Sequence, residues 1–239
     1  MNTHSLYQVP DKYTGLKHGG AIAIGYMPAA VTFGFLAQST GLTFMEAVMM
    51  STFVFAGAAQ YTALGLISAG TGALEIIITT FVLNIRHLLM SASLNEKAEA
   101  SHPVIKAGYA FGITDEVFAV TSTNNGPIPS SYIYSVFLTA YVSWVAFTAA
   151  GHSAGDLLPA FLQTSLSFAI YALFLALLLP PLKKSRKVLV LAGTAALFHG
   201  ILYPFLPEGW AIITAAAAAS ILIEWAAPNS NREEQPAHE

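Results

Sequence analysis

Long runs of apolar residues, each close to the length of a membrane-spanning helix, most constrain what this chain can fold into. A helix that crosses the hydrocarbon core of a bilayer needs roughly 20 mostly apolar residues. Gly, Pro, Asn and Ser residues separate the runs, as they separate helices in general. The pattern predicts an all-α integral membrane protein, a polytopic helical bundle of seven to eight transmembrane segments. The candidate blocks are residues 20–38, 42–69, 72–94, 103–120, 131–151, 157–179, 188–206 and 210–226.

The charged fraction supports this interpretation because it is too low to cover a water-facing surface. Charged residues make up 10% of the 239 residues, whereas soluble domains carry roughly 25%. The formal net charge of −3 is small and scattered, so we expect no nucleic-acid partner. The chain has no cysteine, which excludes disulfides and thiolate chemistry. It also lacks H-E-x-x-H, G-x-S-x-G and phosphate-loop motifs, so we expect neither an enzyme nor a bound metal or cofactor.

We expect three segments along the chain. Residues 1–19 form a polar, cytoplasmic N-terminal segment, residues 20–226 form a transmembrane permease domain, and residues 227–239 form a charged, disordered tail. The first apolar block is followed by many others, so we interpret it as a retained span and not as a cleaved signal peptide.

Basic residues in short loops predict the orientation of the chain in the membrane. The densest basic cluster lies at residues 183–187, and Lys12 and Lys17 precede the first block. Six crossings separate the two groups, so both are expected in the cytoplasm. The loop at 95–106, which also carries lysines, then falls outside. One re-entrant segment would remove that conflict.

The first polar cluster inside a block is Asn84, Arg86 and His87, in VLNIRHLLM. Ionisable groups within a span are expensive and mark a functional site by default. At about 100° per residue, Asn84 and His87 share one helix face while Arg86 points away from both, so a straight helix in lipid cannot hide all three. Either the helix breaks here or protein and water surround it. The alternative is a snorkelling arginine with an interfacial histidine.

The second cluster is Thr114, Asp115 and Glu116, in the middle of block 103–120. Such a sequence is typical of a helix start, because the first side chain accepts a backbone N–H and acidic residues suit the helix dipole. A start inside a span indicates a broken helix, which transporters use near the membrane midplane. The alternative is that residues 103–113 are interfacial and the acids lie in headgroup water.

A third stretch, FVFAGAAQYTALGL, contains Phe55, Gly57 and Gln60. Its block, 42–69, is too long for an untilted span. Small residues such as Gly57 let helices approach closely, and an amide in lipid needs a hydrogen-bond partner. Helix packing alone explains the glycine, whereas an apolar residue would pack more favourably than Gln60, which therefore indicates a polar site.

These stretches resemble the AzlC family of branched-chain amino-acid exporters. The resemblance rests on GYMPAAVTFGFLAQSTGLT followed by the elements G-A-x-Q, N-x-R-H and T-D-E in this order and spacing. It covers about the first 120 residues in detail and continues to about residue 226 in hydropathy. It implies a multi-pass permease of the bacterial inner membrane that exports leucine, isoleucine, valine and sometimes methionine. It also implies a partner, a small membrane subunit of the AzlD type.

A zwitterionic substrate with an apolar side chain needs three different surroundings. We expect Arg86 or the amides of a broken helix to bind its carboxylate, and Asp115 or Glu116 to bind its ammonium group or a coupling proton, as in proton antiport. The expected substrate-binding set is Phe55, Gly57, Gln60, Asn84 and Arg86, and the expected proton-coupling set is His87, Asp115 and Glu116.

Two other classes of protein fit the same residues. A channel would line a continuous pore with the buried polar groups, with Phe55 and Gly57 at a constriction. A membrane scaffold would use these groups only to hold helices together or to a partner. Within the exporter itself, the alternative for the charged cluster is an Arg86–Asp115 ion pair that only holds the bundle together.

Overall fold

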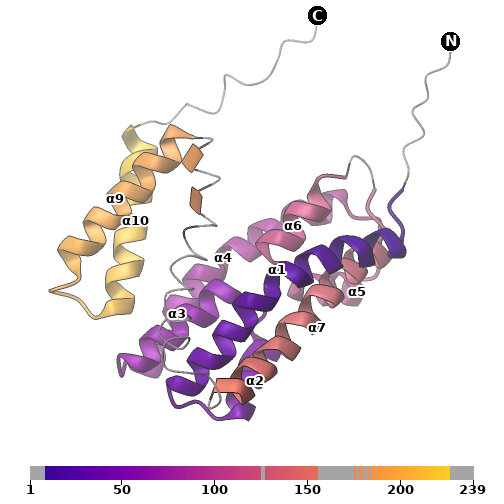
Figure 1. The fold of residues 1–239 in the computed structure, drawn as a ribbon. Helices are drawn as coiled ribbons and strands as arrows, with labels where there is room; N and C mark the ends of the chain where they lie inside the picture. The colour runs from indigo at the N-terminus through magenta and orange to yellow at the C-terminus, as the bar shows by residue number, and fades with distance from the viewer. Residues whose placement is uncertain are drawn as a thin grey trace, which may run out of the picture.

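The computed structural model describes residues 9–124, 127–155, 175, 178–179, 182–183 and 185–226. Within these residues the secondary structure is helical apart from turns and one isolated β-bridge, between Ala98 and Ile128. The prediction of an all-α protein is confirmed for this part of the chain (Figure 1). Its helices are α1 (Lys12–Ser39), α2 (Phe44–Phe53), α3 (Gly57–Ser68), α4 (Ala73–Lys97), α5 (Pro103–Phe111), α6 (Asp115–Ser122), α7 (Ser130–Ala154), α9 (Arg186–Leu202) and α10 (Glu208–Ala226).

Several long helices identify the chain as a helical membrane protein. In the described part of the chain, four helices are long and apolar enough to cross a membrane, namely Lys12–Ser39, Ala73–Lys97, Ser130–Ala154 and Gly209–Ala226. The count of seven to eight spans stays a prediction. Four of the expected features lie outside the described residues, namely residues 1–8, most of block 157–179, Lys184 of the basic cluster, and the tail 227–239.

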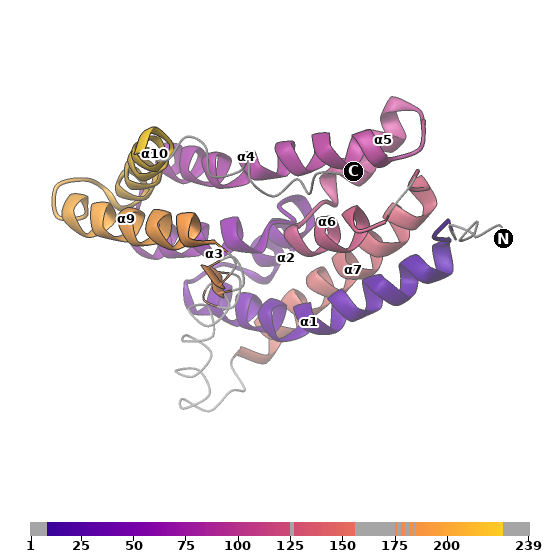
Figure 2. The ribbon, with the colours of Figure 1, turned by 90° about the horizontal axis from the view of Figure 1, so that it is seen from above.

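Helices α1 and α7 lie side by side and run in the same direction, along one side of the bundle (Figure 2). Gly15 near the start of α1 faces Tyr132, and Gly34 near its end faces Thr148, so the contacts advance together along both helices. A Cβ on Gly34 would overlap the carbonyl oxygen of Thr148. The absence of a side chain therefore lets the two backbones touch, as small residues do between helices in membranes.

Block 42–69 forms a hairpin of two short helices instead of one span. Helix α2 runs inward along α7 from its far end. The ring of Phe44 packs edge-on against His152 near the C-terminus of α7, with 5.7 Å between centroids. One residue before α2 ends, the backbone oxygen of Thr52 accepts a 2.9 Å hydrogen bond from the Tyr141 hydroxyl. Tyr141 lies three turns back along α7, so α2 points into the middle of the bundle.

The chain turns at Val54–Ala56, and α3 then returns toward the end from which α2 came. Gly57, the first residue of α3, faces the ring of Trp144 in the middle of α7. Ile67, near the end of α3, shares a surface pocket with Leu42 and Glu46, which precede and begin α2. The α2–α3 segment is thus a re-entrant hairpin, with its break deep in the bundle.

Block 103–120 forms a second hairpin that enters from the opposite end. The Tyr134 hydroxyl donates to the Ile105 carbonyl near the start of α5, and the ring of Phe111 at its end packs against Tyr141. The chain breaks after α5, and α6 begins at the expected cap. The Oγ1 atom of Thr114 accepts the N–H of Val117 at 3.3 Å. The predicted helix start inside this block is confirmed.

The two hairpins divide the first half of the chain into two matching units. Each unit is a long helix followed by a re-entrant hairpin, α1 with α2–α3 and α4 with α5–α6 (Figures 1 and 2). The two units have opposite orientations, because the hairpins enter from opposite ends. Inverted units of this kind are common in secondary transporters, and they place binding sites at the interface between units.

The same topology removes the conflict in the distribution of lysines. Lys97 at the end of α4 donates to the Ser122 carbonyl at the end of α6, at 2.7 Å. The Asn124 side chain, just beyond α6, contacts the Tyr132 hydroxyl at 3.5 Å, and Tyr132 lies against Gly15 of α1. The lysines of loop 95–106 therefore lie at the same end as Lys12 and Lys17, because the α2–α3 hairpin that precedes this loop is re-entrant, as the expected single re-entrant segment requires.

Helices α9 and α10 pair with each other and contact the bundle through α4 (Figure 1). Lys187 at the start of α9 forms a 2.6 Å ion pair with Glu224 near the end of α10, so the two helices are antiparallel. The Glu75 carboxylate of α4 accepts the backbone N–H of Gly209 at 2.7 Å, at the N-terminus of α10. This carboxylate supplies the negative charge that a helix N-terminus favours.

Gly34→Ala tests whether the α1–α7 contact holds the bundle together. The added methyl group overlaps the backbone of Thr148, and overpacking of this kind costs about 1–3 kcal/mol. We expect the melting temperature of the purified protein in detergent to fall by about 2–4 °C per kcal/mol. Gly20→Ala is the matched control, because within the described residues no atom outside the backbone of α1 lies within 4 Å of the new Cβ. Equal melting temperatures for the two variants would contradict the close contact.

Candidate functional site

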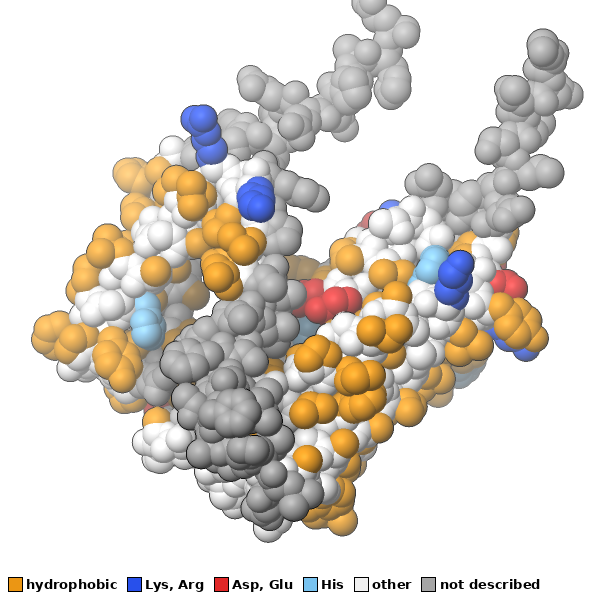
Figure 3. All heavy atoms as spheres, viewed as in Figure 1, with side chains coloured by type: hydrophobic (Ala, Val, Ile, Leu, Met, Phe, Trp, Pro, Cys, Tyr) orange, Lys and Arg blue, Asp and Glu red, His pale blue; other side chains and the backbone are white. Residues whose placement is uncertain are grey.

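A cavity of about 720 Å³ lies where the two helix breaks meet. Residues of α1, the first break, α3, α4, α6 and α7 line it, so both inverted units contribute. On α1 the lining extends from Ala29, beside the breaks, to His18, toward the end of the bundle that contains Lys12. Figure 3 shows acidic side chains, in red, within a hollow on this face of the molecule. The cavity is within the size range of small-molecule sites.

The charged wall of the cavity is an ion pair between α4 and α6. The Nη1 atom of Arg86 lies 2.8 Å from Oδ2 of Asp115, and the side chains are 42% and 36% exposed. His87 and Glu116 line the cavity beside them. The structure therefore brings together the four ionisable residues that were predicted as site residues.

Helix α4 is continuous through residues 73–97, so the helix does not break at Arg86. The second expected explanation holds: protein and the cavity surround this side chain. The cavity faces α4 between the directions of Arg86 and His87. At 100° per residue that direction lies about 110° from Asn84. Asn84 accordingly does not line the cavity, and its buried Oδ1 atom has no hydrogen-bond partner within the described residues.

Tyr26 of α1 joins the acidic side of the cavity to the other inverted unit. Its hydroxyl donates to Oε2 of Glu116 at 2.5 Å and lies 2.7 Å from Oγ1 of Thr114. A phenol has one proton to donate, so the threonine hydroxyl donates to the phenol oxygen. Tyr26 is not among the site residues predicted from the sequence. The available signal was a phenol in the middle of an apolar block, between Gly25 and Pro28.

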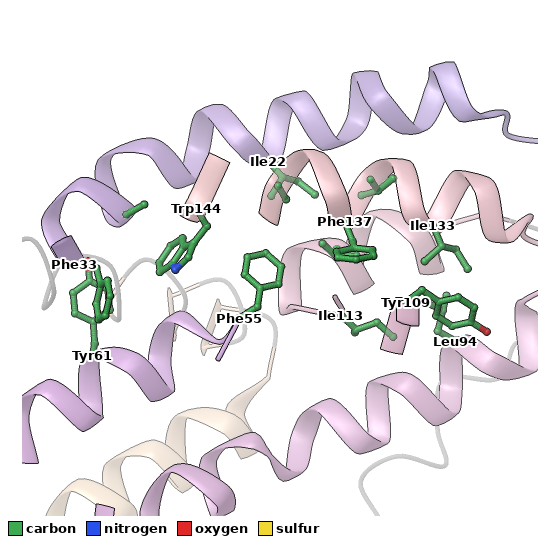
Figure 4. Close-up of a cluster of buried hydrophobic side chains, with 14 of the residues drawn as sticks. Ile22, Phe33, Phe55, Tyr61, Leu94, Tyr109, Ile113, Ile133, Phe137 and Trp144 are labelled. Carbon is green, nitrogen blue, oxygen red and sulfur yellow. The ribbon is translucent and has the colours of Figure 1, made fainter. Parts of the chain in front are cut away.

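The apolar side of the cavity surrounds the first helix break. Phe55 and Gly57 line it as expected, and so does Trp144, which was likewise not predicted from the sequence. Figure 4 shows Phe55 and Trp144 next to each other within the buried aromatic cluster. Gln60 was predicted to contact the substrate. In the structure this residue is fully buried and does not line the cavity.

Gln60 instead belongs to a buried hydrogen-bonded network that ties the first hairpin to α7. Its Oε1 atom accepts the indole N–H of Trp144 at 2.8 Å, and its amide donates to Oγ of Ser51 at 3.1 Å. The Ser51 hydroxyl lies 2.8 Å from that of Thr148. The network supplies the partner that an amide in lipid requires, and it connects α2, α3 and α7.

Helix α3 begins at the cavity with free backbone donors. Ala56, the residue before α3, makes no side-chain cap. The N–H groups of Gly57 and Ala58 have no acceptor among the described residues, and both residues line the cavity. The first N–H groups of a helix, together with its dipole, favour an anion such as a carboxylate.

Fold and cavity define a multi-pass helical membrane protein with a charged site between two re-entrant hairpins. A sequence model of the AzlC protein family matches residues 21–158, more than half of the 239 residues. The chain belongs to the AzlC family, as the resemblance predicted.

Similar proteins agree with this assignment. A membrane protein of Archaeoglobus fulgidus is 37% identical over 93% of this chain and 98% of its own length. The inner membrane protein YgaZ of Escherichia coli is 29% identical over 78% of this chain and 80% of its own. The branched-chain amino acid transport protein AzlC of Bacillus subtilis is 25% identical over 70% and 66%. No solved structure matches the chain. Family and relatives give the chain a role in membrane transport.

Removal of one member of the ion pair tests its contribution to stability. Asp115→Asn leaves the Arg86 guanidinium without its counterion. We expect the melting temperature to fall by the equivalent of about 1 kcal/mol, less than for a fully buried pair because both groups are partly exposed. The double variant Arg86→Gln with Asp115→Asn removes both charges and should recover most of the loss. A double variant no more stable than the single one would contradict the pairing.

Proposed function

We propose that the chain is the substrate-binding subunit of a secondary transporter that exports branched-chain amino acids across the bacterial inner membrane, by antiport with protons. The observation that carries this proposal is the cavity between the breaks, which has charged groups of both signs on one side and aromatic and aliphatic groups on the other. The Bacillus subtilis relative is named a branched-chain amino acid transport protein, which supports the same substrate class.

The ion pair offers a direct way to bind a zwitterion. In the structure, Arg86 and Asp115 form an ion pair at 2.8 Å. A bound amino acid separates them: the guanidinium takes its carboxylate and Asp115 takes its ammonium group, so each charge exchanges one partner for another. The N–H groups of Gly57 and Ala58 offer a second donor set for the carboxylate. The aliphatic side chain then lies against Phe55.

Glu116 is the better placed of the two acids to carry a coupling proton. Asp115 has a cationic partner, whereas the hydrogen-bond partner of Glu116 in the described part of the chain is the hydroxyl group of Tyr26. Protonation of Glu116 exchanges a charge-assisted hydrogen bond for a neutral one, which is roughly half as strong. It thereby weakens a contact between α1 and α6, that is, between the two inverted units.

The cavity extends toward one end of the bundle and is bounded by buried groups toward the other, which supports alternating access. The cavity extends toward the end of α1 that carries Lys12 and Lys17, the expected cytoplasmic end. On the other side of the breaks, the α2–α3 hairpin packs against α1 and α7 through fully buried groups, among them Ser51 and Thr148. A cavity reached from the cytoplasmic end suits an exporter. Release of the substrate on the other side then requires the α2–α3 hairpin to leave α7.

We also propose a small membrane subunit of the AzlD type as a partner. Helix α4 supports this, because it carries the arginine of the site yet exposes a row of large apolar side chains, including Leu74, Ile77, Phe81 and Leu88. A partner helix on this face would contact the helix that holds Arg86.

Efflux measurements test the substrate, the coupling and the partner together. Cells or proteoliposomes that contain this chain with the small subunit should export leucine, isoleucine and valine, and export should fall in the absence of the subunit.

Glu116→Gln should uncouple leucine efflux from an imposed pH gradient, whereas Asp115→Asn should weaken leucine binding. Full proton-coupled export by both variants would overturn the assigned roles. An ion conductance in planar bilayers without saturable amino-acid flux would instead identify a channel.

A disulfide across the closed end tests alternating access. The chain has no native cysteine, so Ser51→Cys with Thr148→Cys gives a single engineered pair, at positions whose hydroxyls lie 2.8 Å apart. Oxidation should abolish efflux and reduction should restore it, because the hairpin can no longer leave α7. The control pair, Ala23→Cys with Ser143→Cys, links α1 to α7 where Ser143 donates to the Ala23 carbonyl at 2.9 Å, and should leave efflux intact. Unchanged efflux with the first pair oxidised would rule out this movement.

A further inference from the structure

The indole of Trp144 forms a fixed wall of the cavity. It is 3% exposed, and its N–H donates to Gln60. The ring of Tyr26 packs edge-on against it, with 5.2 Å between centroids, and that of Phe33 stacks at 6.4 Å. A tryptophan held by one hydrogen bond and two aromatic neighbours has little freedom to change its position.

Gly57 faces the free edge of this indole. A Cβ on Gly57 would lie 3.0 Å from Cη2 of Trp144, closer than an ordinary van der Waals contact. Both residues line the cavity, and Gly57 is also the first residue of α3. The separation between the start of α3 and the indole is therefore limited by the side chain at position 57.

The surroundings of Trp144 determine in which direction the indole ring can be displaced. Gln60, which holds the indole N–H, is fully buried and is itself held by Ser51, and Ser51 contacts Thr148 of α7. The hydrogen-bonded side of the ring thus leads into a closed network. A group added at position 57 occupies space beside the cavity or displaces the ring edge into it, and either change narrows the cavity.

We propose that the contact between Gly57 and Trp144 sets the largest substrate side chain that the cavity accepts, with Gln60 as the positioning residue that holds the indole in place. This inference rests on the proposed transport of amino acids. It assigns size selection to the first hairpin and to α7, whereas the charges that bind the zwitterion come from α4 and α6. Size and charge are thus recognised by different elements of the fold.

A comparison of substrates tests the inference. Counterflow of radiolabelled alanine, valine, leucine and phenylalanine is measured in proteoliposomes that contain the full chain and its small subunit. In a hydrophobic pocket one methylene group changes selectivity by about tenfold or more. We therefore expect Gly57→Ala to lower the ratio of leucine to alanine flux by about tenfold, and Trp144→Phe to raise the ratio of phenylalanine to leucine flux.

Three variants separate size selection from loss of structure. Gly65→Ala, in the same helix, should keep the wild-type ratios, because in the described part of the chain no atom outside the backbone of α3 lies within 4 Å of the new Cβ. Gln60→Leu removes the acceptor of the indole N–H and should broaden selectivity, whereas Gln60→Asn keeps an uncharged amide at this buried position and should change selectivity less. Equal reduction of all four fluxes by Gly57→Ala overturns the inference and leaves the export function standing. Absence of flux for every amino acid in the wild type overturns both.

Discussion

An unpaired backbone amide or carbonyl group is expensive inside a bilayer, and this constraint governs the described fold. A helix can break at membrane depth only where protein or water covers the free groups. Both breaks obey this rule, because Phe55, Ala56, Ile113 and Thr114 are all buried. The free donors at the start of α3 face the cavity. The covered region between the breaks is also the place where charges can be tolerated, so the backbone constraint and the charged site share one location.

The inverted arrangement of the two units gives each side of the cavity a different chemistry. The second unit supplies Arg86 from its long helix and Asp115 from its hairpin, which meet as an ion pair. The first unit supplies Phe55 and the start of α3. Tyr26 is the contact between them, since it belongs to the first long helix and donates to an acid of the second hairpin. A change of charge in that acid is thereby coupled to how the two units hold together.

Polar residues in apolar blocks fall into two groups with different surroundings. Arg86, Asp115 and Glu116 retain partial exposure in the cavity, as charged groups within a helical bundle require. Gln60 is fully buried, with partners on both sides of its amide. Both groups are equally anomalous in a hydropathy profile. The difference between them is that a neutral amide can be satisfied by two neighbouring side chains, whereas a charge also needs water or a counterion.

The sequence by itself determined the membrane class, the break before Thr114 and the charged residues of the site, because each depends on local chemistry: the length of apolar runs, capping preferences and the cost of charge in lipid. The family followed from motif order. Only the tertiary structure decided that blocks 42–69 and 103–120 re-enter, that Tyr26 and Trp144 join the site, and that Gln60 and Asn84 lie outside the cavity lining. Hydropathy measures how apolar a segment is and not where its two ends lie. The direction that a side chain faces is likewise set by packing against helices distant in the sequence.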